Sequence, residues 1–215
     1  LVPIALKDGW VKKCAGVTLK DIKLTVFQTE KKHIVTKGKL LFTHVGISGP
    51  PVLNMSRAVG DLLKGGEVAI LLDLFPAIDI PVLREQLQKI LIEQSNKKIK
   101  NALSQLVAPA LVDPLLQLAG IDGETPNHSV RSEKRKELAV LMKAIPLHVA
   151  GLLGNNKAIV SSGGVSLSEV NFKTMESRIV PGLYLVGDVL NVDRPSGGYS
   201  LQLCWTTGSV AGDHS

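Results

Sequence analysis

The segment that most constrains the fold of this chain lies near its C-terminal end, over residues 181–205. Residues 183–186 form an apolar run that is typical of a strand, and this run leads directly into Gly187-Asp188. A Ser-Gly-Gly turn at residues 196–198 then opens a helix whose apolar side chains lie around nearly its whole circumference. Such a helix must be covered by a large body of protein. Residues 158–215 supply only two expected strands besides this helix, which is too little to cover it.

Length and composition indicate a globular protein. The chain has 215 residues, of which 45% are hydrophobic and 20% charged, and this suits one large or two modest domains. Its apolar runs are all shorter than the roughly 18 residues that a membrane helix needs, and its start does not resemble a signal peptide. We therefore expect a soluble protein without a membrane partner and a cytoplasmic location. Cys14 and Cys204 are far apart among apolar residues, so we expect reduced thiols and no metal site.

The net charge of +6 raises the question of nucleic-acid binding. The densest basic clusters, at residues 97–100 and 134–136, both fall where helices are expected. Neither cluster contains interleaved aromatic residues on which bases could stack. A solvated helix face explains these clusters better than a phosphate-binding stripe does, and we expect no nucleic-acid partner.

Residues 15–43 are expected to form an antiparallel sheet or a small barrel, and residues 44–80 a helix followed by a buried strand. Segments that alternate or are continuously apolar predict strands over residues 17–20, 22–26, 40–43 and 68–75. Turn residues occur at 30–33 and 37–39. Between the strands, the apolar spacing of residues 51–63 predicts a helix, with Ser48 as the residue that caps its N-terminus.

Residues 81–145 are expected to be helical. Apolar residues recur at helical spacing over 83–91 and again over 99–107, and prolines and glycines then divide the region into pieces. Ser132 is the expected N-cap of the last helix, which Pro146 should terminate. Further along, strands are expected over residues 158–160 and 183–186.

The C-terminal segment carries the most specific chemistry in the chain. Gly187 allows a close approach to the backbone, while the Asp188 carboxylate can accept hydrogen bonds from sugar-type hydroxyls. Gly197 and Gly198 leave the N–H groups and the positive dipole end of a helix free for an electronegative oxygen. Each piece alone is typical of an ordinary turn or cap. Together, at this short spacing, they predict a site for a polar ligand such as a dinucleotide cofactor.

Other candidate groups have plainer alternatives. His44, beside Thr43, could act as a substrate-facing acid or base, although a histidine that ties down a turn is the simpler interpretation. Ser48 could be a nucleophile, but Pro50 replaces the last glycine of a Gly-x-Ser-x-Gly elbow. Asp193-Arg194 is interpreted as a surface pair, and a role near a cofactor stays open. The remaining histidines lack the spacing of metal ligands.

Two stretches of the chain resemble one family. Residues 182–203, preceded by Ser162-Gly163-Gly164-Val165 and residues 174–177, resemble the C-terminal FAD-contacting segment of the BaiN-type flavoproteins, also described as aminoacetone-oxidase-like NAD(P)/FAD-dependent oxidoreductases. Residues 41–50 resemble the signature of the insert domain in that family. The resemblance covers nearly the whole chain, in the same order.

This resemblance implies an α+β fold in two parts. Residues 1–157 would be the insert domain, β-barrel-like over 1–80 with an appended helical subdomain over 81–145. Residues 158–215 would be the C-terminal piece of an α/β FAD-binding domain.

The resemblance also implies which residues contact the cofactor. Gly187 and Asp188 would lie at the ribityl chain, and a turn that follows would offer backbone N–H groups to the pyrimidine edge of the flavin. The residues of that turn are Gly197, Gly198, Tyr199, Ser200, Leu201 and Gln202. Ser200 stands where the family usually has Asn, so a side-chain contact there stays open.

The family's first element is missing from this sequence. The family begins with a strand and a Gly-x-Gly-x-x-Gly turn that hold the FAD pyrophosphate, and no such pattern occurs here. We therefore expect a piece of a longer flavin-dependent oxidoreductase that alone is inactive and does not hold FAD tightly. NAD(P)H is a candidate reductant, the small-molecule substrate is unknown, and a separate N-terminal FAD-binding half is a candidate partner. The alternative is a stand-alone folded binding or interaction module without catalytic activity.

Overall fold

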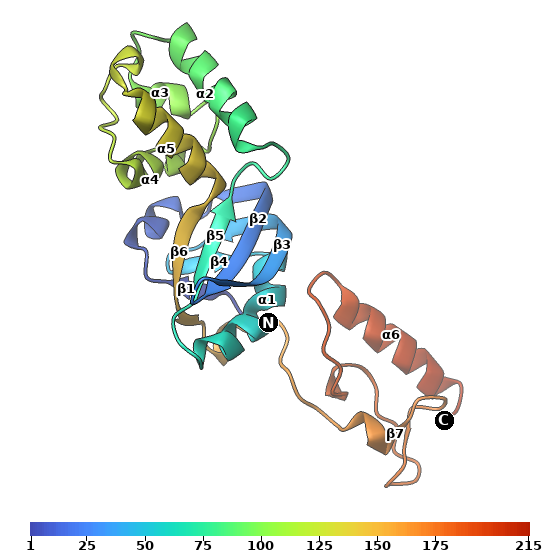
Figure 1. The fold of residues 1–215 in the computed structure, drawn as a ribbon. Helices are drawn as coiled ribbons and strands as arrows, with labels where there is room; N and C mark the ends of the chain where they lie inside the picture. The colour runs from blue at the N-terminus through green and yellow to red at the C-terminus, as the bar shows by residue number, and fades with distance from the viewer. The chain divides into compact units, whose positions relative to one another are not determined.

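The computed structural model describes residues 1–215, except for the side chain of Asn155. The chain divides into two compact units (Figure 1). The larger unit is Pro3–Leu152, and the smaller unit combines Leu1–Val2 with Leu153–Ser215. Backbone hydrogen bonds explain why the first residue belongs to the smaller unit: the Leu1 amino group donates to the Val160 carbonyl at 2.6 Å, and Ile159 N–H donates to the Leu1 carbonyl at 2.9 Å.

The larger unit is built on a closed antiparallel barrel of six strands. They are β1 (Ile4–Leu6), β2 (Thr18–Gln28), β3 (Lys31–Phe42), β4 (Gly46–Ser48), β5 (Ala69–Asp73) and β6 (Ile145–Leu152). Around the barrel they follow the order β1-β4-β3-β2-β5-β6. Alternate residues such as Leu24, Val26, Ile70 and Leu72 point inward and are fully buried. The predicted α+β fold with a barrel-like part is confirmed.

The first hairpin is longer than the sequence pattern predicts. Strands β2 and β3 pair along almost their whole length and turn at Thr29-Glu30, both of which have positive φ. The turn expected at residues 37–39 is wrong, because Gly38 pairs with Ile22 inside the ladder. The register shifts between Leu19 and Ile22, which leaves two residues of β2 in a bulge. A glycine that permits a bulge or bend in a long strand resembles a turn residue in the sequence.

Strand β4 fits between β1 and β3 because its first residue, Gly46, and the residue after its end, Gly49, are both glycines. A Cβ atom at Gly46 would overlap the carbonyl oxygen of Ile4, and one at Gly49, where φ is +109°, would overlap that of Lys39. Ser48 is the last residue of β4, and Gly49 is the N-cap of the following helix, which has no side-chain cap. The prediction that Ser48 caps this helix is therefore wrong.

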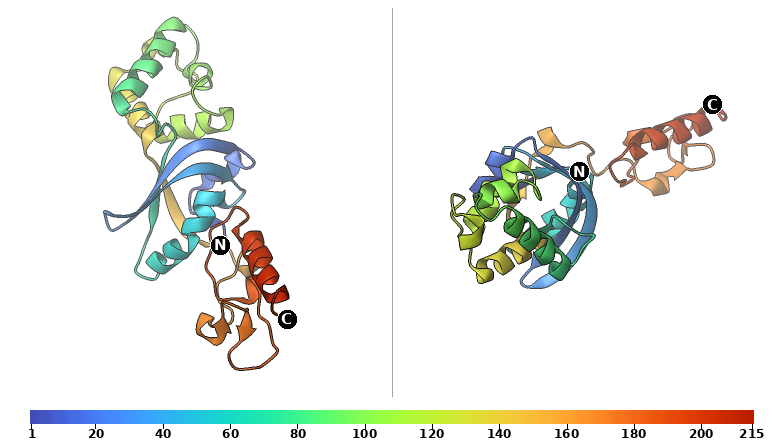
Figure 2. Two further views of the ribbon diagram at one scale, coloured as in Figure 1. Left: turned by 90° about the vertical axis from the view of Figure 1, so that its right-hand side faces the viewer. Right: turned by 90° about the horizontal axis from the view of Figure 1, so that it is seen from above.

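Helices lie at both ends of the barrel (Figure 1, Figure 2). Helix α1 (Pro50–Leu63) packs on β1, β3, β4 and β6, and the short 3-10 helix η1 (Gly9–Cys14) follows β1. At the other end is a helical segment between β5 and β6. It contains α2 (Ile80–Glu93), α3 (Ile99–Leu103), α4 (Pro109–Ala119), η2 (Asn127–Ser129) and α5 (Ser132–Lys143). Among the helices of the described residues, none has both the length and the apolarity to cross a membrane.

Helical spacing predicts the buried face of this segment well. Leu83, Leu87 and Leu91 of α2 and Ile99 of α3 are all buried, as their spacing indicates. Helix α5 begins at Ser132 itself, so the expected cap is displaced by one residue to Arg131. The sequence pattern did not predict strand β6. Pro146 does follow the end of α5, but it lies within the next strand, opposite Leu71.

A buried ionic cluster joins the barrel to the helical segment. The Asp73 carboxylate at the end of β5 pairs with Lys23 of β2 at 3.1 Å and with Lys143 of α5 at 2.9 Å. The Lys143 ammonium also donates to the carbonyls of Phe75 and Ile78 at 2.6 and 2.7 Å. Asp73 and Lys143 are largely excluded from solvent, with side chains 3% and 13% exposed. Lys143 therefore contacts the connection from β5 to α2 at its start, through Asp73 and Phe75, and near its end, through Ile78.

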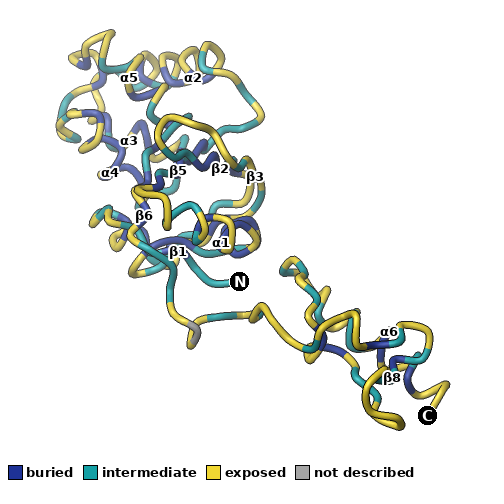
Figure 3. The backbone as a smooth tube through the Cα atoms, turned by 60° about the horizontal axis from the view of Figure 1, so that its bottom comes forward, coloured by how far each residue is buried: buried dark blue, intermediate teal, exposed yellow. Residues whose placement is uncertain are grey.

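The smaller unit has little regular structure and a small core (Figure 3). Its elements are η3 (Asn155–Lys157), η4 (Leu167–Glu169), β7 (Val170–Asn171), β8 (Glu176–Ser177), η5 (Gly187–Val189) and α6 (Tyr199–Gly212). The helix expected after Gly198 is confirmed, but the strands expected over 158–160 and 183–186 are wrong. Residues 183–186 form only an isolated bridge between Tyr184 and Glu176. An apolar run becomes a strand only where a neighbouring strand pairs with it.

Helix α6 is largely uncovered within its own unit. Only Thr207 and Ala211 are buried, whereas Tyr199, Leu201 and Trp205 are more than half exposed. This agrees with the expectation that the C-terminal segment alone is too small to cover such a helix.

Candidate functional site

The turn that carries Asp188 packs directly against α6. Gly187 has a φ of +67°, and its N–H donates to Thr207 Oγ1 at 2.9 Å. A Cβ atom at this position would lie 2.8 Å from Cys204 Sγ. Glycine is therefore required here for the close approach of the turn to α6.

The Asp188 carboxylate is held by an arginine from the following loop. Its Oδ1 atom pairs with Arg194 Nη2, and the Asp188 side chain is 64% exposed whereas that of Arg194 is only 7% exposed. Arg194 also donates from Nε to Ser200 Oγ at 2.7 Å and from Nη1 to the Val192 carbonyl at 2.6 Å. The described contacts of the carboxylate all use Oδ1, so Oδ2 remains available for a ligand hydroxyl.

Arg194 has a larger role in this site than its sequence context indicates. The interpretation of Asp193-Arg194 as a surface pair is wrong, because Arg194 is buried and connects Asp188 to the first turn of α6. The neighbouring Asp193 accepts a hydrogen bond from Ser162 Oγ at 3.1 Å. An arginine six residues from an aspartate and six from a serine has no periodic signal, so only the folded loop brings the three together.

The N-terminus of α6 is open. Gly197 and Gly198 have φ values of +109° and +93°, and no described heavy atom lies within 4 Å of a Cβ atom placed at either one. Gly198 is the N-cap, and no side chain caps the helix. The N–H groups in the first turn of a helix have no intrahelical acceptors, and the helix dipole is positive there. This end of α6 therefore suits an electronegative ligand oxygen.

The predicted residues in the first turn differ in what they can offer. The Ser200 hydroxyl is already used by Arg194. Gln202 N–H donates to the Gly198 carbonyl at 3.2 Å, and its side-chain amide donates to Thr206 Oγ1 at 3.0 Å. Gln202 is thus engaged within the helix, so the backbone before it is the better donor. Tyr199 and Leu201 present exposed apolar side chains beside these donors.

These groups fit the polar part of a flavin in their chemistry. An exposed carboxylate oxygen can accept hydrogen bonds from the hydroxyls of a ribityl chain. The open helix N-terminus can donate to carbonyl oxygens, such as those of the flavin pyrimidine. The structure places Asp188, Ser200 and the two glycines in the same small unit.

The weak catalytic candidates lie in the larger unit, at the turn between β3 and β4. Thr43 Oγ1 accepts from Gly46 N–H at 3.1 Å, and Thr43 N–H donates to the Gly46 carbonyl at 2.8 Å. The His44 side chain is exposed at the tip of this turn. Thr43, rather than His44, therefore ties the turn.

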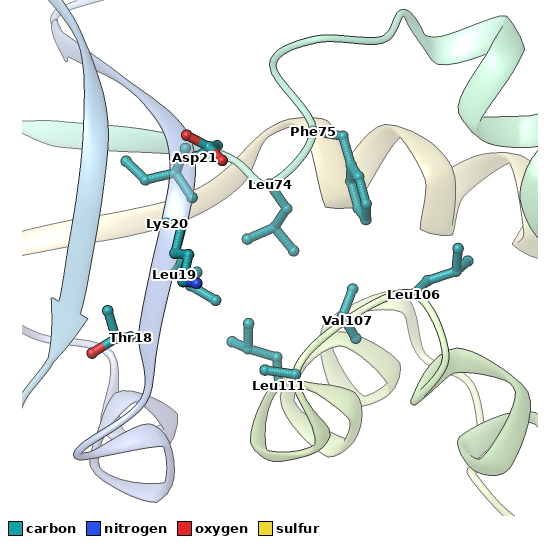
Figure 4. Close-up of a pocket in the computed structure, with 11 residues that line it drawn as sticks. Thr18, Leu19, Lys20, Asp21, Leu74, Phe75, Leu106, Val107 and Leu111 are labelled. Atoms are coloured by element: carbon teal, nitrogen blue, oxygen red, sulfur yellow. The ribbon is translucent and has the colours of Figure 1, made fainter.

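A cavity that the sequence analysis missed lies between β2 and the helical segment (Figure 4). Its volume is about 320 Å³, and eight of its eleven lining residues are apolar. In Figure 4 the side chains of Leu74, Val107 and Leu111 converge on it. Lys20 and Asp21, the two residues of the bulge in β2, also line it. The only sequence signal for this cavity is the break in strand alternation at the bulge.

The described residues include neither a disulfide nor a metal-binding cluster. Cys14 Sγ donates to the Ala110 carbonyl at 3.2 Å, and burial raises the pKa of its thiol. Cys14 and Cys204 are both free. Within the described part of the chain, no group of three or more His, Cys, Asp or Glu side chains could hold a metal ion.

Comparison with known proteins relates the whole chain to named relatives. The 3-dehydro-bile acid delta(4,6)-reductase of Clostridium scindens is 30% identical over 213 residues, which is 99% of this chain and 52% of the relative. The ribosomal RNA dihydrouridine synthases of Escherichia coli and Haemophilus influenzae are each 31% identical and are matched by 96% of this chain over 49% of their own length. The chain thus spans about half the length of these curated relatives.

A family model provides the assignment. Residues 1–160 match the HI0933-like protein barrel and H2TH domain. The matched region contains the closed six-stranded barrel and the helical segment between β5 and β6. The expected family relationship is confirmed at this level, and the chain belongs to the HI0933-like protein family.

Proposed function

We propose that this chain supplies the substrate-side domain and a flavin-contacting segment of a flavin-dependent oxidoreductase. The observation that carries the proposal is the grouping of Asp188, Arg194 and Ser200 beside the open, glycine-led N-terminus of α6. Family membership and a relative named as a reductase support it.

In this proposal each group has a defined task. Asp188 Oδ2 accepts hydrogen bonds from the ribityl hydroxyls, and Arg194 holds the carboxylate in place. The backbone N–H groups at the start of α6 hold an electronegative oxygen of the flavin pyrimidine. When bound, FAD supplies the hydride chemistry, while the protein supplies position and electrostatics. The proposal assigns the grip on the FAD pyrophosphate to polypeptide outside residues 1–215, in the same protein or in a separate chain.

The names of the relatives favour one class of reaction. Both a delta(4,6)-reductase and a dihydrouridine synthase, by their names, saturate a carbon–carbon double bond in a ring. We propose the same class for the whole protein: a hydride and a proton are added across an activated double bond, with NAD(P)H as the source of the two electrons. The reaction would take place in the cytoplasm, where Cys14 and Cys204 stay reduced. No particular observation favours a stand-alone interaction module.

Flavin titration of the purified chain tests the site. We expect FAD and FMN to bind weakly and about equally, because these residues contact only the parts that the two flavins share. Asp188→Asn should weaken both by about tenfold, the magnitude expected for a hydrogen bond to a charged group. The measurement is quenching of flavin fluorescence, with the thermal unfolding midpoint as a check on folding.

Asp213→Asn is the matched control. Asp213 is an exposed carboxylate at the opposite end of α6, so its replacement makes the same charge change away from the site. No saturable quenching by either flavin, or equal weakening by the two substitutions, would contradict the proposed site.

A further inference from the structure

The helical segment contains a small cationic cavity between α2 and the start of α5. Its lining residues are Arg84 and Gln88 of α2 with Ser132, Arg135 and Lys136 of α5. Its volume is about 80 Å³. Four of its five lining residues are exposed and Arg135 is half-buried, so the cavity is a small depression that is open to solvent.

The cations that line this cavity have no anionic partner among the residues that the structure describes. Among the described residues, Arg84, Arg135 and Lys136 make no ion pair, and the cavity lining includes no carboxylate. Arg135 uses Nε to donate to the Val130 carbonyl at 2.8 Å, which fixes its position and leaves its terminal amino groups available. Three positive charges in one concavity attract an anion much more strongly than isolated surface charges do.

Neighbouring basic residues show the contrast. Lys134 pairs with Glu137 at 2.7 Å, and Lys98 and Lys100 both pair with Glu124. Glu85 and Glu133 adjoin lining residues in sequence, but neither lines the cavity. Lys89, Lys97 and Arg131 also make no ion pair within the described residues, so what distinguishes Arg84, Arg135 and Lys136 is that they line one cavity together.

The remaining groups at the cavity are also able to donate hydrogen bonds. Helix α5 has 12 residues and begins at Ser132, and its N-cap Arg131 makes no side-chain cap. The first-turn N–H groups and the helix dipole therefore favour an anion at this end. The Ser132 hydroxyl and the Gln88 amide add neutral donors. A compact oxyanion with several acceptor oxygens matches this set of donors.

We propose that this cavity binds a phosphate group. The group could be the phosphodiester of a polynucleotide or the phosphate of a small ligand, because the chemistry that recognises them is shared. The inference is independent of the flavin site, since it rests on residues of the other unit.

Titration of the chain with inorganic phosphate, at ionic strength held constant with sodium chloride, tests the cavity. We expect saturable binding at millimolar concentrations by calorimetry. The variants Arg84→Gln and Lys136→Gln should each weaken it several-fold without changing the unfolding midpoint in phosphate-free buffer. Lys89→Gln is the matched control, because Lys89 is an exposed cation of α2 that does not line the cavity.

A second titration, with a fluorescently labelled single-stranded RNA, distinguishes the two sources. If the phosphate belongs to a polynucleotide, each cavity variant should lower RNA affinity and reduce the slope of log K against log salt by about 0.7 per lost phosphate contact. If inorganic phosphate binds and RNA does not, a small phosphate ligand is the source and the proposal stands. Failure to bind inorganic phosphate, or equal losses in Lys89→Gln and the cavity variants, would overturn it.

Discussion

At the residue scale, Glu124 shows how one side chain can fix a loop. Its carboxylate pairs with both Lys98 and Lys100, and Lys98 also forms a β-bridge with Pro126. The hydrogen bonds and charges of the two lysines lower the pKa of Glu124 from its ordinary value of 4.5 to about 2. Since the folded state holds the carboxylate ionised, the pair stabilises the fold above pH 4.5 and stops doing so as the pH falls towards 2.

Glu124→Gln should therefore lower the stability at neutral pH and flatten its dependence on pH between about 4.5 and 2. Urea unfolding midpoints measured across this range provide the check. Glu85→Gln is the control, because Glu85 has no ion pair within the described residues. Glu85→Gln should keep the acid dependence of the parent chain. If Glu124→Gln keeps it as well, Glu124 does not stabilise the fold through its pairs with Lys98 and Lys100.

At the scale of elements, the ionic cluster around Lys143 links α5, the last helix of the helical segment, to strands β2 and β5 of the barrel. Lys143→Met would leave Asp73 with Lys23 as its one cationic partner among the described residues, and the carbonyls of Phe75 and Ile78 without this donor. Removing one partner of a buried pair costs about 3–5 kcal/mol, and we expect a loss of unfolding free energy of that size. Urea denaturation measures it.

Lys64→Met is a suitable comparison for this substitution. Lys64 pairs with Asp61 on an exposed surface, and such pairs contribute little to stability. Its unfolding midpoint should stay close to that of the parent chain. A similar midpoint for Lys143→Met would show that the cluster does not join the two parts.

The sequence predicts the elements whose signal is local. Helices α1, α2 and α6 follow from their apolar spacing, and the glycine-led start of α6 is identified correctly. Strand β6 is missed because Pro146 is typical of a helix end, and the strand exists only through its pairing with β1 and β5. At the candidate site, the contact between Asp188 and Arg194 could not be predicted, because it depends on the conformation of the loop between them.

At the scale of the whole molecule, the two units differ greatly in their cores. The larger unit buries a continuous apolar cluster that runs from the barrel into the helical segment. The core of the smaller unit has four buried residues: Val170, Met175, Leu190 and Ala211. Because stability follows apolar burial, the smaller unit should open at much lower free energy than the larger one.

Limited trypsin digestion measures this difference. Cleavage should begin at Lys157 and Lys173, which are exposed in the smaller unit, and leave a persistent product that contains Pro3–Leu152. Mass spectrometry of the early products identifies the first cuts. Lys157→Gln combined with Lys173→Gln should slow the first step and leave later cuts within the barrel unchanged. First cuts inside the barrel would show instead that the larger unit opens first.

The position of the helical segment between β5 and β6 has a topological consequence. These strands are antiparallel neighbours, with Leu72 opposite Ile145. The chain therefore re-enters the barrel next to the point at which it leaves β5. A short hairpin turn could in principle connect the same two strands. The order of strands in the barrel therefore does not depend on the length of chain that connects β5 to β6, and the helices add to the apolar core without interrupting the sheet.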